Sequence, residues 1–111
     1  MMIKRGDIYR VNLEPTRRSE QQGNARPCVV LSVGAFNNKL PTIGVVPLST
    51  AARSLPPLII PVPSAGRDTS IAVCNQLRTV DKSRITGGLV AQMSAADLQK
   101  VEHGVKQYYS L

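Results

Sequence analysis

Aromatic and metal-binding residues are scarce in this sequence. Its 111 residues include no tryptophan, one phenylalanine, three tyrosines, one histidine and two cysteines. The core must therefore be built mainly from Val, Leu, Ile and Ala. Cys28 and Cys74 lie inside apolar runs rather than at metal-ligand spacings, and one histidine leaves no nitrogen–sulfur cluster for zinc. We expect two buried free thiols, as in a reducing compartment, and no metal or other cofactor.

Long apolar runs are also missing. No segment approaches the roughly 20 residues of a membrane-spanning helix, and charge interrupts residues 3–7, where a signal peptide would be apolar. The sequence has no glycine-rich phosphate loop, nucleophile elbow, HExxH or CxxC motif. We therefore expect a cytoplasmic protein without membrane contact, whose length fits one domain over residues 1–111.

Acidic residues are few relative to basic ones. The chain has 14 Lys and Arg against 7 Asp and Glu, which gives a formal net charge of +7. An excess of this size indicates a polyanionic partner. Charge alone does not choose between RNA, DNA and an acidic protein.

Alternating and β-branched segments predict short strands. The strand at 28–33 is apolar on both faces and should be central, whereas Pro47 favours an edge or a bulge, and prolines around 58–62 favour an edge. In the first strand Ile8, Arg10 and Asn12 share one face, the pattern of a half-buried strand. Residues 79–85 continue as a short strand or turn that Gly87 and Gly88 break. The five expected strands are 6–13, 28–33, 43–48, 58–62 and 70–77.

One helix is expected at the C-terminal end. Ser94 and Asp97 have the spacing of a capping box. One apolar stripe follows at helical spacing, and His103 lies off it, as a solvated residue. Together the segments predict a mainly β fold with a C-terminal helix, in a small curled antiparallel sheet or barrel. The stripe consists of Leu98, Val101, Val105 and Tyr108.

Groups that can bind phosphate collect where the predicted strands begin and end. Arg26 precedes Pro27, and its planar guanidinium can hold two phosphate oxygens at once. Glu20 lies in the preceding polar loop, and Ser49 with Thr50 follows a strand end. The hydroxyls could equally form turn hydrogen bonds, and the loop charges could simply be solvated. A second strand end carries Asn75, Gln76 and Arg78, whose amides need either structural partners or a ligand.

These groups would suffice for RNA cleavage without a metal. RNA supplies its own nucleophile, the 2′-OH, so an enzyme needs only to remove that proton, stabilise the phosphorane-like charge and protonate the leaving 5′-oxygen. An arginine can supply the charge, hydroxyls and amides can donate hydrogen bonds, and a carboxylate can act as base. The products would be a 2′,3′-cyclic phosphate and a 5′-OH.

Four ordered motifs resemble the MazF/PemK/Kid toxins of bacterial type II toxin–antitoxin modules, which are sequence-specific endoribonucleases. Residues 5–9 (RGDIY) are similar to the family's opening strand, and 19–31 (SEQQGNARPCVVL) to its SEQxG…RPxVVL signature. Residues 46–50 (VPLST) and 75–81 (NQLRTVD) resemble its two later blocks. The resemblance runs nearly end to end.

The resemblance implies an SH3-like small barrel of the MazF/Kid/CcdB toxin type, paired into a homodimer that binds single-stranded mRNA. It also implies an antitoxin with a flexible acidic tail. Arg26 matches the family's catalytic arginine, and Ser49 falls where many members have a catalytic threonine, with Thr50 able to share the role. Glu20 matches a loop carboxylate implicated in some members. We expect RNA contacts from Arg17, Arg18, Ser19, Gln21, Asn24, Arg53, Asn75, Gln76 and Arg78.

One departure from the family bears on mechanism. In the Kid branch a loop histidine, an arginine and an aspartate form the acid–base set, at positions held here by Ser19, Val73 and Asn75. An asparagine cannot take up a proton at neutral pH, so that set does not transfer. Two other functions therefore stay open, a non-catalytic member that binds nucleic acid or antitoxin, and a gyrase-poisoning toxin.

Overall fold

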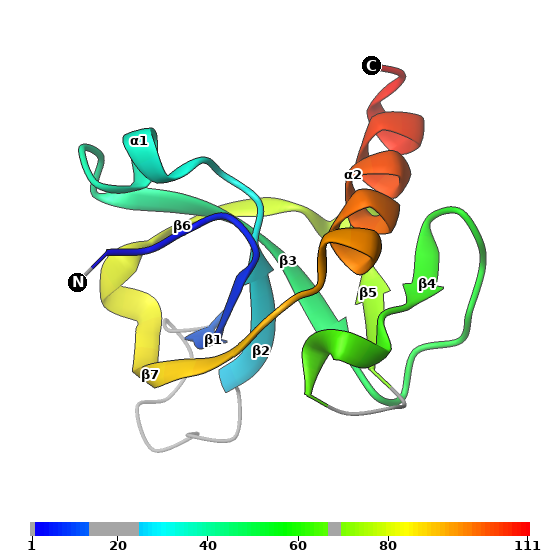
Figure 1. Cartoon of the computed structure of the whole chain (residues 1–111), viewed down its shortest axis with the longest axis horizontal. Helices are drawn as coiled ribbons and strands as arrows, with labels where there is room; N and C mark the ends of the chain where they lie inside the picture. The colour runs from blue at the N-terminus through cyan, green and yellow to red at the C-terminus, as the bar shows by residue number, and fades with distance from the viewer. Residues whose placement is uncertain (1, 14–24, 67–69) are drawn as a thin grey trace.

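The described part of the chain folds into a curled antiparallel sheet with a C-terminal helix packed against it (Figure 1). The structure is a computed structural model that describes residues 2–13, 25–66 and 70–111. The strand order is β4-β5-β3-β2-β1-β7, and β6 pairs with β3. The prediction of a mainly β fold with a C-terminal helix is confirmed. The strands are β1 Asp7–Asn12, β2 Ala25–Val30, β3 Thr42–Ser49, β4 Ile59–Pro61, β5 Ile71–Val73, β6 Arg78–Asp81 and β7 Ile85–Gln92; the helices are α1 Gly34–Asn37 and α2 Ala95–Tyr109; and the 3₁₀ turns are η2 Pro63–Ala65, η3 Cys74–Gln76 and η4 Lys82–Arg84.

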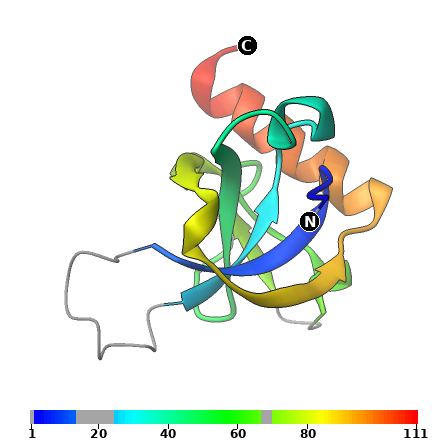
Figure 2. The same cartoon turned by 90° about the vertical axis from the view of Figure 1, so that its left-hand side faces the viewer.

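The sheet buries residues on both of its faces. Ile8 belongs to the cluster that contacts α2, whereas its neighbours Tyr9 and Val11 belong to a second cluster. The predicted half-buried pattern holds from Tyr9 to Asn12 but not at Ile8, which is buried on the same face as Arg10 where the sheet curls toward α2 (Figure 2). Arg10 stays exposed between these buried neighbours. The two predicted free thiols, Cys28 and Cys74, are both buried.

Strand β2 is central as predicted, but β3 is not the edge strand that Pro47 indicated. Strand β3 pairs with β6 from Thr42 to Val45 and with β5 from Leu48 to Ser49. Pro47 falls between these two partners, so its missing N–H interrupts neither ladder. Strand β4 does lie at the edge of the sheet, as expected.

Several boundaries differ from the sequence expectation. The strand expected at 28–33 is β2 at Ala25–Val30, so Arg26 and Pro27 lie inside the strand rather than before it. The strand expected at 70–77 ends at Val73, and residues 74–76 form the 3₁₀ turn η3. The glycine pair 87–88 does not end the strand region but lies inside β7, which pairs with β1. A bulge in that pairing accommodates the glycines, and Gly87 has a positive φ of 78°.

Helix α2 begins at the predicted residue and packs on the sheet through Val101 and Val105. Tyr108 was expected on this apolar stripe, but it is half exposed because the last helical turn extends past the sheet. Gly104 marks the closest approach, since a Cβ there would lie 2.6 Å from the Pro57 carbonyl oxygen. His103 is exposed, as expected for a solvated residue. Among the described residues, no helix is long and apolar enough to cross a membrane.

The start of α2 forms a closed polar network. The Ser94 hydroxyl accepts a hydrogen bond from the Asp97 amide at 3.1 Å, which is the first half of the predicted capping box. The Asp97 carboxylate does not complete the box. It accepts instead from the amide and hydroxyl of Ser64, at 2.9 and 2.5 Å. The helix is thereby fastened to the turn η2.

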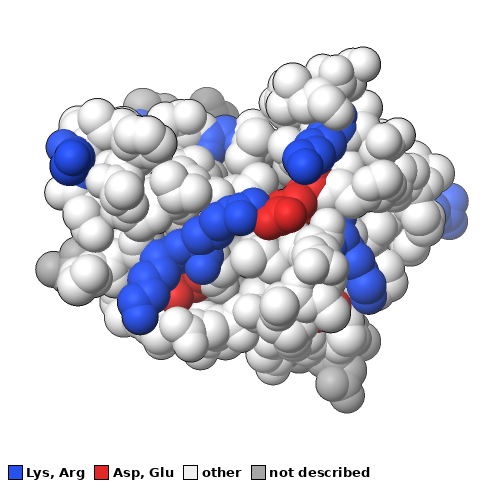
Figure 3. Space-filling view, turned by 45° about the horizontal axis from the view of Figure 1, so that its top comes forward, with Lys and Arg blue, Asp and Glu red and all other residues white. Residues whose placement is uncertain are grey.

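Two basic side chains on the α2 side of the molecule form ion pairs. Arg5 forms an ion pair with Glu102 and donates through Nε to the Leu31 carbonyl at 2.9 Å. The Lys100 Nζ lies 3.4 Å from the Asp97 Oδ1. Figure 3 shows the acidic side chains of this face against a stripe of basic ones, while other basic side chains on the same face have no acidic neighbour in view.

Candidate functional site

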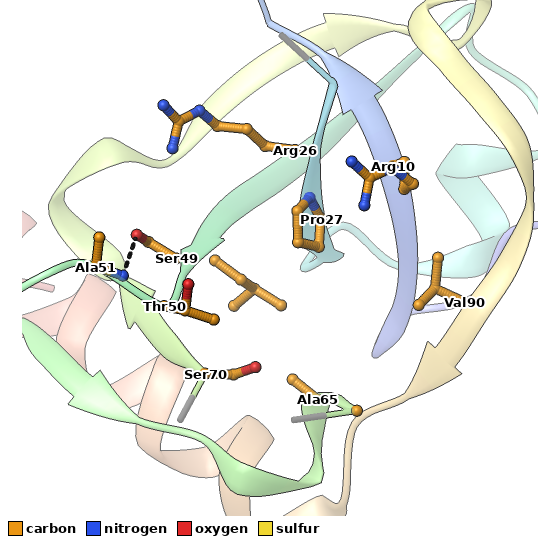
Figure 4. A pocket seen from close by; sticks show the side chains of 11 residues that line it. Arg10, Arg26, Pro27, Ser49, Thr50, Ala51, Ala65, Ser70 and Val90 are labelled. Atoms are coloured by element: carbon orange, nitrogen blue, oxygen red, sulfur yellow. Dashed lines mark hydrogen bonds between the residues drawn. The ribbon is translucent and has the colours of Figure 1, made fainter. Parts of the chain in front are cut away.

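Pairing of β1 with β2 places two arginines at the same end of the sheet. Their side chains leave on opposite faces of the ladder, since sequence neighbours alternate, and both line one pocket. Across β1 and β2, Val11 pairs with Arg26 and Arg10 pairs with Pro27. The β2–β3 register, with Cys28 opposite Pro47, directs the end of β3 toward the same region. Figure 4 shows Arg10 and Arg26 on opposite sides of Pro27, with Ser49 and Thr50 below Arg26 and Ser70 farther down the same pocket.

Two pockets share this end of the sheet. The first pocket, of about 450 Å³, is lined by Arg10, Arg26, Pro27, Leu48, Ser49, Thr50, Ala51, Ala65, Gly66, Ser70 and Val90. The second pocket, of about 440 Å³, is lined by Leu13, Arg26, Pro47, Leu48, Ser49, Ala52, Ile59, Val73, Gln76 and Arg78. Both are large enough for a small organic group such as one nucleotide.

Arg26 and Ser49 belong to both pockets, together with Leu48. The Ser49 oxygen accepts a hydrogen bond from the Ala51 amide at 3.0 Å. This bond orients the hydroxyl and leaves its hydrogen available for donation to a ligand. An extended ligand that passes from one pocket to the other would therefore contact the Arg26 guanidinium and the Ser49 hydroxyl where the pockets meet.

The potential of this region is positive. The described lining of the two pockets contains three arginines, Arg10, Arg26 and Arg78, and no carboxylate. Burial raises the pKa of the nearby Cys28 thiol to about 12, although the charges of Arg78 and Arg26 oppose that shift. Cys28 is thus a neutral core residue at physiological pH, and the reactive polar groups of the pockets are arginines, hydroxyls and an amide.

Comparison with known proteins identifies the family. The PemK-like, MazF-like toxin of type II toxin–antitoxin system family matches residues 4–109. The chain belongs to this family, which is a family of endoribonucleases. It is 36% identical to the endoribonuclease EndoA of Bacillus subtilis, over 78% of this chain and 77% of EndoA.

Solved structures confirm the predicted fold type. Crystalline MazF of Deinococcus radiodurans superposes with a TM-score of 0.82 at 22% identity, covering 100% of this chain and 99% of that protein. An endoribonuclease from Mycobacterial species, solved in complex with its cognate antitoxin, gives a TM-score of 0.79 at 20% identity, covering 98% and 96%. The curled sheet with its C-terminal helix is therefore the MazF toxin fold.

The structure brings together some of the residues expected from the sequence. Arg26 and Ser49 border both pockets, Thr50 lines the first, and Gln76 and Arg78 line the second. Asn75 and Arg53 line neither of these two pockets. The buried Oδ1 of Asn75 has no hydrogen-bond partner in the described part of the chain. The other expected residues, Arg17, Arg18, Ser19, Glu20, Gln21 and Asn24, lie outside the described residues.

Two pocket residues were missed by sequence reasoning. Arg10 lies in β1 and Ser70 precedes β5, and both line the first pocket. Arg10 did carry a signal, because an arginine in the middle of an apolar strand must reach solvent. Ser70 carried none, since its place beside the pocket depends on pairing between β3 and β5.

Over residues 2–13, 25–66 and 70–111, no three His, Cys, Asp or Glu side chains gather closely enough to hold a metal ion.

Proposed function

We propose that this protein is the toxin of a type II toxin–antitoxin module and that it cleaves single-stranded mRNA without a metal, inhibiting translation. The observation that carries the proposal is the position of Arg26 and Ser49 at the junction of two nucleotide-sized pockets. An RNA strand that occupies both pockets would have one phosphodiester at that junction.

Arg26 holds the phosphate at the junction and stabilises the charge that develops during cleavage. A guanidinium suits this task because its N–H groups match two phosphate oxygens. Ser49 donates its hydroxyl hydrogen to the same phosphate, and Thr50, which is exposed beside it, can share this role. Glu20 is a secondary candidate for the base.

The proposed reaction begins with the 2′-OH of the substrate. Its oxygen attacks the adjacent phosphorus as a base removes its proton, and the bond from phosphorus to the 5′-oxygen breaks with protonation of that oxygen. The products carry a 2′,3′-cyclic phosphate and a 5′-OH. No water is consumed in this step, and the positive charge comes from Arg26 rather than from a metal.

The partners we propose are a cognate antitoxin with an acidic flexible tail and a second copy of this chain. The excess of seven positive charges favours an acidic partner. The similar mycobacterial endoribonuclease was solved with its cognate antitoxin. A cytoplasmic location fits a protein that meets mRNA. Light scattering of the purified protein should give about twice the 12.0 kDa chain mass.

A cleavage assay in EDTA tests the proposed activity. A long single-stranded RNA is incubated with the purified protein, and the cut sites and end groups are mapped. We expect cleavage, a 5′-OH that polynucleotide kinase can label, and no cleavage where the mapped nucleotide is replaced by its 2′-deoxy form. Arg26→Ala should leave the RNA intact. Intact RNA with the wild-type protein would overturn the proposal.

Asn75 in place of an acidic residue keeps a second candidate function open, that of a member which binds RNA or antitoxin without cutting. The same assay separates the two, because a binder would shift the RNA in a gel and leave it whole. A parallel reaction with DNA gyrase and supercoiled plasmid tests the third possibility, gyrase poisoning, which would produce linear DNA.

A further inference from the structure

The bulge between β1 and β7 forms part of the wall of the first pocket. Ile8 pairs with Ala91 and Arg10 pairs with Thr86. Between these two pairs, β1 advances by two residues while β7 advances by five. The extra residues, 87–90, leave the ladder. Their departure uses the positive φ of Gly87, and it brings Val90 to the pocket.

The bulge exposes apolar side chains where a sheet would usually bury or omit them. Leu89 is 52% exposed and Val90 is 49% exposed. Neither contributes to the described core clusters. Exposed apolar residues beside a concave surface mark a contact site for a ligand or partner.

Arg10 stands next to this apolar wall. Its Nη2 donates to the Ala25 carbonyl at 2.9 Å, which fixes the guanidinium across β1 and β2. Figure 4 shows the Arg10 side chain between Pro27 and Val90, with Arg26 on the far side of Pro27. The other Arg10 nitrogens have no carboxylate partner among the described residues and can bind an anion.

The opposite side of the first pocket is polar. The Ser70 residue is only 6% exposed, and Thr50 lies beside it in Figure 4. A base seated against Pro27 and Val90 would meet these hydroxyls along its edge, where they can donate or accept. The cation thus suits a phosphate, and the apolar wall and the hydroxyls suit the face and the edge of a base.

We propose that the first pocket is a binding subsite for the nucleotide next to the cleaved bond, in which Arg10 binds its outer phosphate and Val90 supports its base. The proposal deepens the proposed function, since it takes RNA as the ligand. Arg10 and the bulge then extend the bound strand beyond the phosphate at Arg26, on the side away from Arg78.

A binding titration tests the subsite separately from cleavage. A fluorescent 2′-O-methyl RNA containing the mapped sequence cannot undergo 2′-OH attack, so anisotropy reports binding alone. Arg10→Ala should weaken binding about 10-fold, because a hydrogen-bonded charge is lost. It should also make the slope of log affinity against log salt shallower by about 0.7, the value for one single-strand phosphate contact. Arg10→Lys should restore most of the slope.

Arg84→Ala is the matched control. Arg84 lies in η4 and lines neither pocket, yet its loss removes the same charge. An equal effect of Arg84→Ala and Arg10→Ala would show that only net charge matters and would overturn the subsite.

An abasic nucleotide locates the base contact. Removing the base beside the cleaved bond should weaken binding to the wild type, and it should weaken binding to Val90→Ser much less. Equal losses in both proteins would exclude contact with the bulge. If Arg10→Ala and Val90→Ser weaken binding of an acidic antitoxin peptide but not of RNA, the pocket binds protein and the proposal is wrong. Mapped cleavage by the wild-type protein with none of these binding effects would overturn the subsite and leave the proposed function standing.

Discussion

Two regions of the molecule differ in how their charged side chains are surrounded. One, the pocket face, is the end of the sheet that carries the two pockets, and the other, the helix face, is the side covered by α2. On the helix face, Arg5 pairs with Glu102 and Lys100 lies beside Asp97. On the pocket face, three arginines line two adjoining pockets without a carboxylate among the described lining residues: Arg10, Arg26 and Arg78.

We infer from this difference that the paired charges of the helix face stabilise the fold, whereas the arginines of the pocket face serve to bind a ligand. Cations that lie near one another repel and do little for folding, so their presence around one pair of pockets suits the binding of an anion. On the other face, the Arg5–Glu102 pair links α2 to the residues before β1, and hydrogen bonds from Ser64 to Asp97 fasten α2 to η2. Substitutions on the pocket face should therefore change activity without much change in stability, and substitutions on the helix face should do the reverse.

The largest expected effect is that of Arg26→Ala on cleavage. Removing a group that stabilises developing charge typically costs about 100- to 1,000-fold in rate. Single-turnover cleavage should fall by at least that factor, while the melting temperature stays within a few degrees, because the side chain is exposed. Cleavage equal to the wild type would show that the catalytic phosphate lies elsewhere.

The hydroxyl pair offers a smaller and more specific effect. Ser49 borders both pockets and is oriented by the Ala51 amide, whereas Thr50 lines only the first pocket. Ser49→Ala should lower the cleavage rate by about 10- to 100-fold, the value of a hydrogen bond to a charged group. Thr50→Ala should have less effect. A larger loss of cleavage rate in Thr50→Ala than in Ser49→Ala would show that Thr50 is the hydroxyl that contacts the phosphate.

On the helix face, Asp97→Asn should reduce stability. Burial raises the pKa of Asp97, but hydrogen bonds from Ser64 and the nearby Lys100 outweigh burial and place that pKa below its usual range. A depressed pKa stabilises the folded state above the unfolded-state pKa of about 3.9, and this contribution disappears as the pH falls through the folded-state pKa.

Chemical denaturation from about pH 3 to pH 7 measures this contribution. The substitution should cost about 1–3 kcal/mol of unfolding free energy at neutral pH. The difference in unfolding free energy between the wild type and the variant should shrink as the pH falls toward about 3. Lys100→Gln, which removes only the exposed partner, is the control and should cost less. A difference independent of pH would mean that ionisation of Asp97 does not contribute.

The smallest expected effect is that of Glu102→Gln, which breaks the ion pair with Arg5. Both side chains are partly exposed, at 28% and 33%. Pairs of this kind contribute at most about 1 kcal/mol. The melting temperature should fall slightly, and RNA cleavage should be unchanged. A clear loss of cleavage would break the division between the two faces.

Local sequence was sufficient for several elements of the fold. Ser94 begins α2 because its hydroxyl can cap the helix without any distant residue. Apolar alternation and β-branched residues located β2 and β3. The motif around Arg26 and the hydroxyls at the end of β3 were likewise visible in the sequence, and they led to two residues that border both pockets.

Other features depended on distant partners. Pro47 is compatible with a central strand only because β5 and β6 pair with different parts of β3. The glycines 87 and 88 suggested a break, but pairing with β1 keeps them in a bulged strand. Propensity describes one residue and its neighbours, whereas these outcomes depend on ladders between segments far apart in sequence.

The sequence by itself thus determined the MazF-like motifs, the helix start and the excess of positive charge. Only the tertiary structure decided that Arg10 and Arg26 line one pocket, that Ser70 lines it too, and that the β7 bulge brings Val90 to the same pocket. The physical reason is register. Hydrogen-bonded pairing of β1 with β2 and β7 sets which side chains meet, and a single-residue shift would turn each of them to the other face.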